Sequence, residues 1–310
     1  MKKGRIGNSA LEIAPLALGG NVFGWTADEP ASFAILDEFV AAGGSMIDTA
    51  DVYSAWAPGH SGGESETVIG RWLKRSGKRD KVVIATKVGF MAGLAPETIA
   101  AACDASLERL GVDCIDLYYQ HKDDETVPLA DSLGAFDELR RAGKIRAVGL
   151  SQFSAPRLEE AMRVAKAERL EPPCALQTWY NLVEREKLEG PLLDAAVSND
   201  LGILPFYSLA NGFLTGKYRS RDDLGKSPRG LRNAEYLEGR GMRVLEALDE
   251  IAAENGAALA TVALAWTMAQ PGITAPIASA TSLDQLREMV ASLNLELTAA
   301  QIEGLNAASA

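Results

Sequence analysis

Four side chains in this sequence have the types and placements needed for acid–base chemistry at an oxygen atom. Asp48 and Tyr53 lie in the stretch "IDTADVYSAW" (47–56), where an apolar segment gives way to a polar turn, and Lys87 and His121 each end a later apolar segment. Tyrosine has an unperturbed pKa of about 10, and a nearby ammonium group favours the phenolate and lowers that value. A carboxylate would keep the ammonium charged, and a histidine would steer a carbonyl oxygen. The set therefore predicts a tuned general acid/base.

Each of these residues taken alone has a more ordinary interpretation. An Asp after a strand most often caps a turn or helix, a strand-end Lys is usually solvated, and a lone His is more often a structural donor. The only histidines are His60, in a Gly/Pro/Ser-rich loop, and His121, and no thiol cluster occurs, which argues against a zinc site. Asp124 and Glu125 near His121 keep a carboxylate-rich divalent-metal site as a minor alternative. No G-x-S-x-G or P-loop sequence is present.

Short apolar runs alternate with longer amphipathic segments along the chain. The length and content of these runs suit buried strands, and the spacing of the earlier ones is close to the roughly 30 residues of a βαβ unit. The predicted strands lie within residues 11–20, 45–50, 81–88, 114–121, 144–153, 174–181, 202–209 and 273–280.

Helical patterns fill the intervals between the predicted strands. The clearest cover residues 96–111, 127–143 and 155–170, and Pro96 and Gly111 suit the start and the end of the first. Eight strands alternating with helices predict an α/β fold, a (β/α)8 TIM barrel formed as a single domain by residues 1–310. The rival, a doubly wound open sheet, would usually carry G-x-G-x-x-G after its first strand, and this sequence has none.

Three segments lie outside the strand–helix rhythm. The first 14 residues read as a β-hairpin with Gly7-Asn8 at its turn, which would cover the bottom of the barrel. Residues 56–64 and 210–240 read as long βα loops, and loops of that length in a compact domain are usually functional. Both follow the C-terminal ends of predicted strands, which is the face where barrel enzymes build their sites.

Composition narrows the class of protein. The chain is 47% hydrophobic, with a net charge of −11 and a pI of about 4.9, and an acidic surface disfavours nucleic acid and anionic membrane as partners. No run of about 18 apolar residues indicates a membrane span, and no apolar segment typical of a signal peptide follows the N-terminus. With three cysteines that lack C-x-x-C spacing, we expect a cytoplasmic enzyme that acts on a small molecule, as a monomer or a weak homo-oligomer.

Several motifs closely resemble the aldo-keto reductase superfamily, and together they span nearly the whole chain. They are "IDTADVYS", "GGESETVIG", "IATKVG", "SLERLGVDCIDLYYQHKDD", "LRRAGKIRAVGLSQFS" and, similar to the bacterial and plant branch, "GFLTGKY". The resemblance implies a TIM barrel and reversible NADP(H)-dependent reduction of aldehydes or ketones. It also implies that Asp48, Tyr53, Lys87 and His121 form the catalytic tetrad, with Tyr53 as the proton donor.

The resemblance further implies a set of binding residues. Those for the cofactor are Ser151, Gln152 and Gln177 at the nicotinamide carboxamide, Tyr207 stacked on the nicotinamide ring, Ser208, Leu209, Asn211, Gly212 and Lys217 along the pyrophosphate, and Ser279, Thr281, Gln285 and Met289 at the adenosine end. An aromatic substrate mouth would be lined by Phe23, Trp25, Trp56, Phe90 and Trp179.

The sequence departs from the family pattern in ways that bear on the cofactor. Gln152 stands where the family usually has Asn, and Leu209 begins a stretch where a Pro is often found. Residues 278–289 offer mostly neutral donors for a 2′-phosphate, and Arg287 should point elsewhere. We therefore expect NADP(H) use with measurable NAD(H) activity, or a cation from the long loop, Arg229 or Arg232. The alternative function is a catalytically silent nicotinamide-binding barrel that serves as a regulatory or binding subunit.

Overall fold

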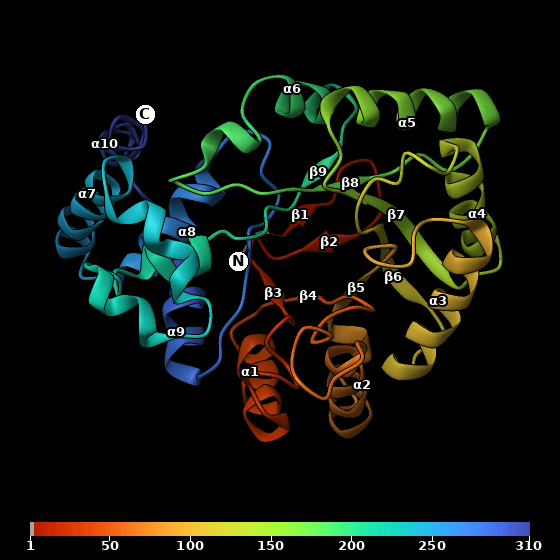
Figure 1. The fold of residues 1–310 in the computed structure, drawn as a ribbon, viewed down its shortest axis with the longest axis horizontal. Coiled ribbons are helices and arrows are strands. Elements are labelled where there is room, and N and C mark those ends of the chain that lie inside the picture. Colours follow the sequence, from red (N-terminus) through yellow and green to blue (C-terminus); the bar gives the residue numbers. More distant parts are fainter. Residues whose placement is uncertain (1–2) are drawn as a thin grey trace.

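The computed structural model describes residues 3–310, and eight parallel strands form its central sheet (Figure 1). Their spatial order is β10-β3-β4-β5-β6-β7-β8-β9. The sheet closes on itself because the Thr274 N–H donates to the Ile203 carbonyl at 2.9 Å and the Ile277 N–H to the Pro205 carbonyl at 2.7 Å. The strands are β3 (Ala17–Gly19), β4 (Met46–Asp48), β5 (Val83–Val88), β6 (Ile115–Gln120), β7 (Ile145–Ser151), β8 (Ala175–Gln177), β9 (Gly202–Ile203) and β10 (Ile277–Ala278).

Helices surround the strands on the outside, as Figure 1 shows. They are α1 (Glu29–Ala41), α2 (Glu64–Ser76), α3 (Pro96–Leu110), α4 (Leu129–Arg141), α5 (Ala155–Glu168), α6 (Pro191–Ser198), α7 (Arg240–Asn255), α8 (Leu259–Ala269), α9 (Leu283–Ala291) and α10 (Ala299–Ala308). The predicted (β/α)8 barrel is therefore confirmed. None of the helices within residues 3–310 combines the length and apolar character that a membrane crossing requires.

Local sequence signals set the element boundaries. Pro96 occupies the first turn of α3, and Gly111 ends that helix with a φ of 63°, a left-handed conformation that favours glycine. The predicted run 202–209 yields only the short strand β9, because Pro205 lacks an N–H and Tyr207 has a φ of 56°. The chain therefore turns away from the barrel at this point and delivers Tyr207 to its C-terminal face.

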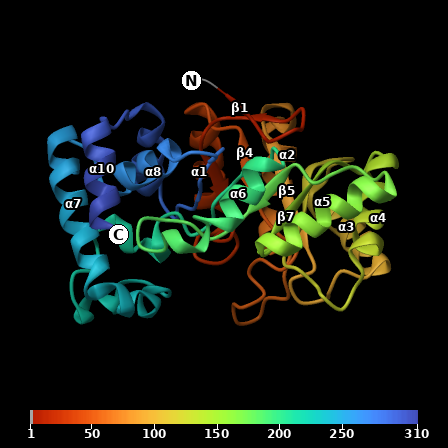
Figure 2. The same cartoon turned by 90° about the horizontal axis from the view of Figure 1, so that it is seen from above.

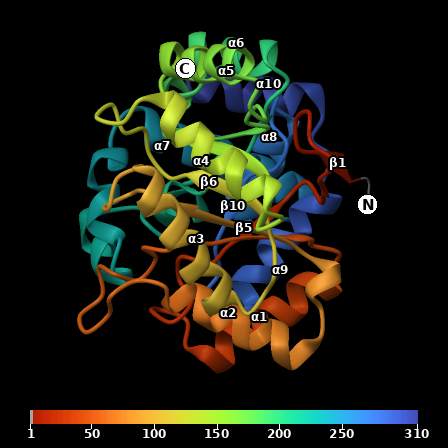
Figure 3. The ribbon, with the colours of Figure 1, turned by 90° about the vertical axis from the view of Figure 1, so that its right-hand side faces the viewer.

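The N-terminal hairpin covers the bottom of the barrel. Strand β1 (Gly4–Arg5) pairs antiparallel with β2 (Glu12–Ile13), as the sequence predicts. Gly7, at its turn, has a φ of 49°, and a Cβ there would lie 2.2 Å from the Cys174 carbonyl, next to the start of β8. Figure 3 shows the hairpin (red) on the opposite side of the molecule from the long βα loops (orange and teal).

The long segment after β9 folds into short 3₁₀ helices and is here named the strap, residues 210–237. It contains η3 (Ala210–Thr215), η4 (Arg221–Lys226) and η5 (Gly230–Leu237), and η5 packs against η3 and α7. Figure 2 shows the strap (teal) beside α7 and on the face opposite the N-terminus. Three shorter 3₁₀ helices complete the chain, namely η1 (Arg79–Lys81), η2 (Arg185–Lys187) and η6 (Ser292–Asn294).

Candidate active site

A cavity of about 810 Å³ opens at the C-terminal ends of the barrel strands. Most of the residues predicted from the sequence line it, namely Asp48, Tyr53, His121, Ser151, Gln152, Gln177, Tyr207, Ser208, Leu209, Asn211, Gly212, Lys217, Ser279, Thr281, Gln285 and Met289, with Trp25, Trp56, Phe90 and Trp179. Lys87 lies directly beneath, fully buried.

The centre of the site is a hydrogen-bonded cluster around the Lys87 ammonium group. Lys87 Nζ donates to Asp48 Oδ2 at 2.7 Å, to the Thr49 carbonyl at 2.7 Å and to the Tyr53 hydroxyl at 3.0 Å. The Tyr53 hydroxyl in turn lies 3.4 Å from Asp48 Oδ2. Parallel pairing places these groups together, because the chain after β4 continues along β5, with the Asp51 N–H donating to the Lys87 carbonyl at 3.2 Å.

The electrostatics of this cluster keep the phenol protonated. Burial, and after it the Asp48 carboxylate, raises the pKa of Tyr53 well above the ordinary tyrosine value. Burial lowers the pKa of Lys87, and Asp48 partly offsets that effect. The sequence predicted that Lys87 lowers the pKa of Tyr53. This prediction is wrong, because burial and the Asp48 carboxylate raise that pKa by more than the Lys87 ammonium group lowers it. The cluster is arranged to hold a proton that it can donate.

His121 is neutral in this site. Burial and the nearby Lys87 charge lower its pKa well below the usual histidine value. Its ring centroid lies 6.0 Å from that of Tyr53, and Nδ1 is buried without a partner among the described residues. A neutral imidazole carries one N–H donor, so His121 can donate to an oxygen beside the phenol.

Three predicted carboxamide-binding residues lie at the C-terminal ends of β7 and β8 and make different contacts. The Gln177 amide nitrogen donates to Asp48 Oδ1 at 2.9 Å, which orients both side chains. Gln152, at a φ of 56°, donates to the His121 carbonyl at 3.1 Å. Ser151 Oγ is buried and has no partner within residues 3–310, so this hydroxyl is free to bind a ligand.

The strap side of the cavity begins at Tyr207. Its ring centroid lies 4.1 Å from that of Trp179, and its hydroxyl accepts from Arg232 Nη1 at 3.2 Å. Asn211, with a φ of 53°, holds Oδ1 buried and without a partner in the described chain. Lys217 Nζ lies close to the backbone of Gly212, where an added Cβ would be 3.0 Å away. This side therefore presents positive charge and unsatisfied polar atoms to the cavity.

The far end of the cavity, toward α9, is lined by neutral donors. The Thr281 N–H and hydroxyl both donate to Gln285 Oε1, at 2.9 and 3.2 Å. Arg287 turns away and pairs with Glu38 at 3.6 Å and with Asp284 at 3.3 Å. The expectation that Arg287 points elsewhere is confirmed.

Arg229, which the sequence offered only as one of two candidate cations, lines this cavity, and so do residues that the sequence did not single out, among them Asn21, Lys226 and Glu288. Arg229 lies with its guanidinium carbon 5.3 Å from the Trp25 ring centroid and beside Asn21, whose amide oxygen can accept from it at 3.2 Å. Burial lowers the pKa of Arg229, and no carboxylate pairs with it within residues 3–310. Glu288 also lines the cavity, one residue before Met289. Arg229 reaches the cavity only because the strap folds over it. The sequence alone could therefore name Arg229 only as one of two candidate cations for the cofactor phosphate.

These atoms fit an anionic nucleotide. The unpartnered Ser151 hydroxyl can donate to an amide or phosphate oxygen, and the unpartnered Asn211 Oδ1 can accept from an amide N–H or a hydroxyl. Arg229 and Lys217, which also line the cavity, suit phosphate charge. Ser151, Gln152 and Gln177 would hold the nicotinamide end of a dinucleotide, and the strap would hold its phosphates.

Aromatic rings line the cavity around Tyr53. The Trp25 and Trp56 rings meet edge to face with centroids 5.4 Å apart, and Phe90 lies 4.9 Å from His121. The prediction for Phe23 is wrong, because its side chain is fully buried in the apolar core. The turn in which its N–H donates to the Gly20 carbonyl at 2.9 Å directs the ring inward, and Trp25 faces the cavity instead.

Asp124, one of the two carboxylates that the sequence places near His121, binds the backbone of the loop around it. Asp124 accepts from the Leu94 N–H at 2.9 Å with one oxygen and from the Thr126 N–H at 3.1 Å with the other. Within residues 3–310, no three His, Cys, Asp or Glu side chains gather as a metal-ion site would require. The minor alternative of a divalent-metal site here therefore gains no support from the geometry.

Comparison with known proteins yields consistent matches. Residues 15–310 match the model of the Aldo/keto reductase family. The chain is 33% identical to "Uncharacterized oxidoreductase YrpG" of Bacillus subtilis, covering 97% of this chain and 94% of that protein. It is 34% identical to "Aldo-keto reductase str7" of Strobilurus tenacellus, over 96% and 86% of the two chains. It is 31% identical to "Aldo-keto reductase yakc [NADP(+)]" of Schizosaccharomyces pombe, over 90% and 83%.

The family model matches nearly the whole chain, and the relatives are similar along almost their full length. A polar cavity at the mouth of a (β/α)8 barrel agrees with these matches. The chain belongs to the aldo/keto reductase family, and the protein is an oxidoreductase of a family that uses nicotinamide cofactors.

Proposed function

We propose that this protein reduces an aldehyde or ketone to the alcohol, reversibly, with NADP(H) as cofactor and Tyr53 as the general acid. The observation that carries the proposal is the position of the Tyr53 hydroxyl, 3.0 Å from the Lys87 ammonium group and at the wall of a cavity lined by aromatic rings. Burial raises the pKa of Tyr53, which favours the protonated form that a general acid needs. A buried proton donor next to a neutral imidazole suits an oxygen that becomes negative during reaction.

Three side chains have different roles at the substrate carbonyl group. The reduced nicotinamide, when bound, supplies the hydride that the carbonyl carbon receives. The His121 imidazole donates an N–H to the carbonyl oxygen and orients it toward Tyr53. The Tyr53 hydroxyl gives its proton to that oxygen, and the Lys87 ammonium group stabilises the phenolate left behind. In the reverse direction the phenolate takes the proton from the alcohol.

The cofactor preference follows from the charges around the cavity. Neutral donors at Thr281 and Gln285 bind a 2′-phosphate without a salt bridge, and they leave no buried cation unpaired when that phosphate is missing. Use of NADP(H) is supported by the relative named for NADP(+), and some NAD(H) activity accompanies it. Because a charge-assisted hydrogen bond contributes about ten- to a hundredfold in affinity, the kcat/KM ratio for NADPH over NADH stays below about a thousandfold.

The proposal is tested by assaying the purified protein with a panel of aldehydes and ketones, each with NADPH and with NADH. We expect carbonyl-dependent loss of reduced-cofactor absorbance, unaffected by a chelator. NADPH binding, followed by fluorescence quenching, without turnover of any carbonyl would overturn the enzyme assignment in favour of a silent binding barrel. Turnover with NADPH and none with NADH would overturn the cofactor reasoning alone.

A further inference from the structure

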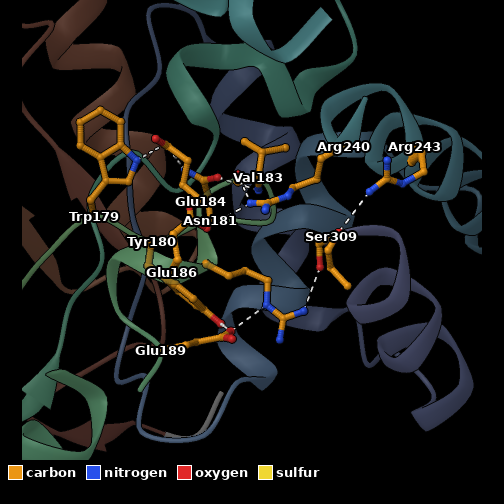
Figure 4. A network of polar contacts seen from close by, with 12 residues as sticks. Trp179, Tyr180, Asn181, Val183, Glu184, Glu186, Glu189, Arg240, Arg243 and Ser309 are labelled. Atoms are coloured by element: carbon orange, nitrogen blue, oxygen red, sulfur yellow. Dashed lines mark hydrogen bonds and ion pairs between the residues drawn. The ribbon is translucent and has the colours of Figure 1, made fainter. Parts of the chain in front are cut away.

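The carboxylate of Glu184 contacts Trp179, one of the aromatic residues that line the cavity. It follows β8, and its Oε2 accepts a hydrogen bond from the indole N–H of Trp179 and one from Asn181 Nδ2 at 3.3 Å (Figure 4). Trp179 lines the cavity, and its ring packs on Tyr207. The only polar group of this wall residue is therefore held from behind by a charged acceptor.

The same small network fixes the backbone next to the wall. Asn181 is fully buried, and its amide nitrogen also donates to the Tyr207 carbonyl at 3.1 Å. Its oxygen accepts from the Val183 N–H at 2.9 Å. Asn181 thus connects the loop that carries Glu184 to the backbone of Tyr207, which fixes the carboxylate relative to the two packed rings.

Glu184 also faces the strap. Burial, and next the Glu184 charge, raises the pKa of Tyr236 in η5 above its usual value, and Tyr236 packs on Phe213 of η3 with ring centroids 5.2 Å apart. The carboxylate therefore lies where the cavity wall meets the segment that covers the cofactor side. No other carboxylate among residues 3–310 accepts a hydrogen bond from Trp179.

We propose that Glu184 is a positioning residue that fixes the indole of Trp179 against Tyr207 and thereby determines which carbonyl substrates the enzyme accepts. The inference rests on the proposed carbonyl reduction. When the Trp179 N–H is hydrogen-bonded to Glu184, the indole ring keeps one orientation and presents one flat face to the cavity. Such a face favours a planar aromatic substrate. Without this hydrogen bond, the Trp179 side chain is free to adopt other rotamers, and the flat surface that fits an aromatic substrate is lost.

The test compares 2-naphthaldehyde with propanal in the wild type and in Glu184→Ala. Since the hydrogen bond to a charged acceptor contributes about tenfold or more to an equilibrium, the ratio of kcat/KM for 2-naphthaldehyde to that for propanal should fall by about tenfold. The loss should come from KM for the aromatic aldehyde and not from kcat. Glu186→Ala is the matched control, because Glu186 is exposed, pairs with Arg240 at 3.0 Å and does not contact Trp179.

Two further variants distinguish positioning from a general structural role. Glu184→Gln keeps an oxygen that accepts from the indole, so it should restore most of the substrate ratio. Trp179→Phe removes the hydrogen bond from the other side and should lower the ratio as Glu184→Ala does. In the double variant the two losses should not add, because both break the same interaction.

The outcomes separate the two proposals. A wild-type protein that reduces neither aldehyde overturns the proposed function. A wild type that reduces both, with Glu184→Ala no different in substrate ratio from Glu186→Ala, overturns the role of Glu184. If Glu184→Ala does not fold, as judged by circular dichroism, Trp179→Phe decides the matter: an unchanged ratio in that variant overturns the inference, and a tenfold fall supports it.

Discussion

The two ends of the barrel differ in whether their buried polar groups have partners. At the bottom, a hollow of about 1090 Å³ lies among the N-terminal ends of β5, β6 and β7, and it is larger than the cavity at the top. Its buried carboxylate, Asp116, forms ion pairs with Arg79 at 2.8 Å and with Arg146 at 3.0 Å, and it accepts a hydrogen bond from the Ile84 N–H at 2.8 Å. At the top, Ser151, Asn211 and His121 hold buried polar atoms without a partner among residues 3–310, and all three line the cavity. Size therefore does not identify the functional hollow, whereas unsatisfied polar groups do.

The largest expected difference between the two ends is in catalysis. Tyr53→Phe removes the proton donor at the top, and we expect carbonyl reduction to fall by at least about a hundredfold, the usual range for losing a positioned general acid. NADPH affinity, measured by fluorescence quenching, should change little because the hydroxyl faces the substrate. A variant that keeps more than about a tenth of the wild-type turnover, with hydride transfer limiting in both, contradicts the role given to Tyr53.

The second prediction concerns the buried cation beside that tyrosine. Lys87→Met preserves length and removes the ammonium group, so the Tyr53 pKa, already raised by burial, should rise further. Alcohol oxidation requires the phenolate, and its rate profile should therefore move to higher pH by about one unit or more. The measurement is the pH dependence of kcat/KM for oxidation. An unshifted profile in a folded, cofactor-binding variant argues against the Tyr53–Lys87 pairing.

The unpaired and the paired arginines offer a direct comparison of roles. Arg229→Ala removes the cation that faces the cavity and should weaken NADPH binding by about ten- to a hundredfold. Arg287→Ala removes a cation that is paired outside the cavity with Glu38 and Asp284, and NADPH affinity should stay within about twofold. Titration by fluorescence quenching measures both. Equal effects of the two substitutions would contradict the assignment of Arg229 to the cofactor side.

At the bottom of the barrel we expect a loss of stability without a loss of activity. Asp116→Asn removes a buried charge that two arginines and a backbone N–H share. The free energy of unfolding should fall by about 1–3 kcal/mol, because hydrogen bonds to a buried charged group are lost. Urea unfolding measures this change, and kcat/KM should remain within twofold of the wild type. A tenfold loss of activity would show that the two ends of the barrel are coupled.

The last prediction concerns the stability contributed by Asp51, whose backbone N–H donates to the Lys87 carbonyl at 3.2 Å. Burial, followed by the Glu66 charge, raises the pKa of Asp51 from 3.8 to about 6. The folded protein therefore binds this proton more tightly than the unfolded chain, and stability falls as the pH rises from about 4 to 6. Asp51→Asn removes that loss, so the variant should gain on the order of 2 kcal/mol near pH 8 and little near pH 4. Urea unfolding at both pH values measures the difference, and a gain equal at the two pH values contradicts it.

The sequence predicted the parts of the site that depend on strand ends. Asp48, Lys87 and His121 lie at the tips of neighbouring parallel strands, so their convergence follows from the barrel itself. Phe23 was misplaced because one residue in a tight turn decides whether a ring faces the core or the cavity. The direction of the Tyr53 pKa was misjudged because burial, which a sequence does not display, outweighed the neighbouring charge.

The strap shows where sequence reasoning ends. The sequence of residues 210–237 reads only as a long loop, and the path of this segment depends on packing of η5 against α7 and of η3 against α8. Arg229 reaches the cavity, and Tyr236 reaches Glu184 and Phe213, only through that path. Glu184 gives no signal in the sequence either, because its partner Trp179 is recognised only when both side chains are seen to face each other.

Closure of the barrel joins the two ends of the chain, and this has a consequence for how the protein is made. Residues 17 and 18 of β3 pair with residues 277 and 278 of β10, and beside this seam the Ser279 hydroxyl lies 2.6 Å from Asn21 in the cavity wall. During synthesis, β3 therefore stays an open sheet edge until almost the entire chain has left the ribosome, and such edges invite pairing with other chains. The cavity has lining residues on both sides of this seam, so its wall is complete only when β10 has paired with β3, and that same pairing removes the open edge of β3.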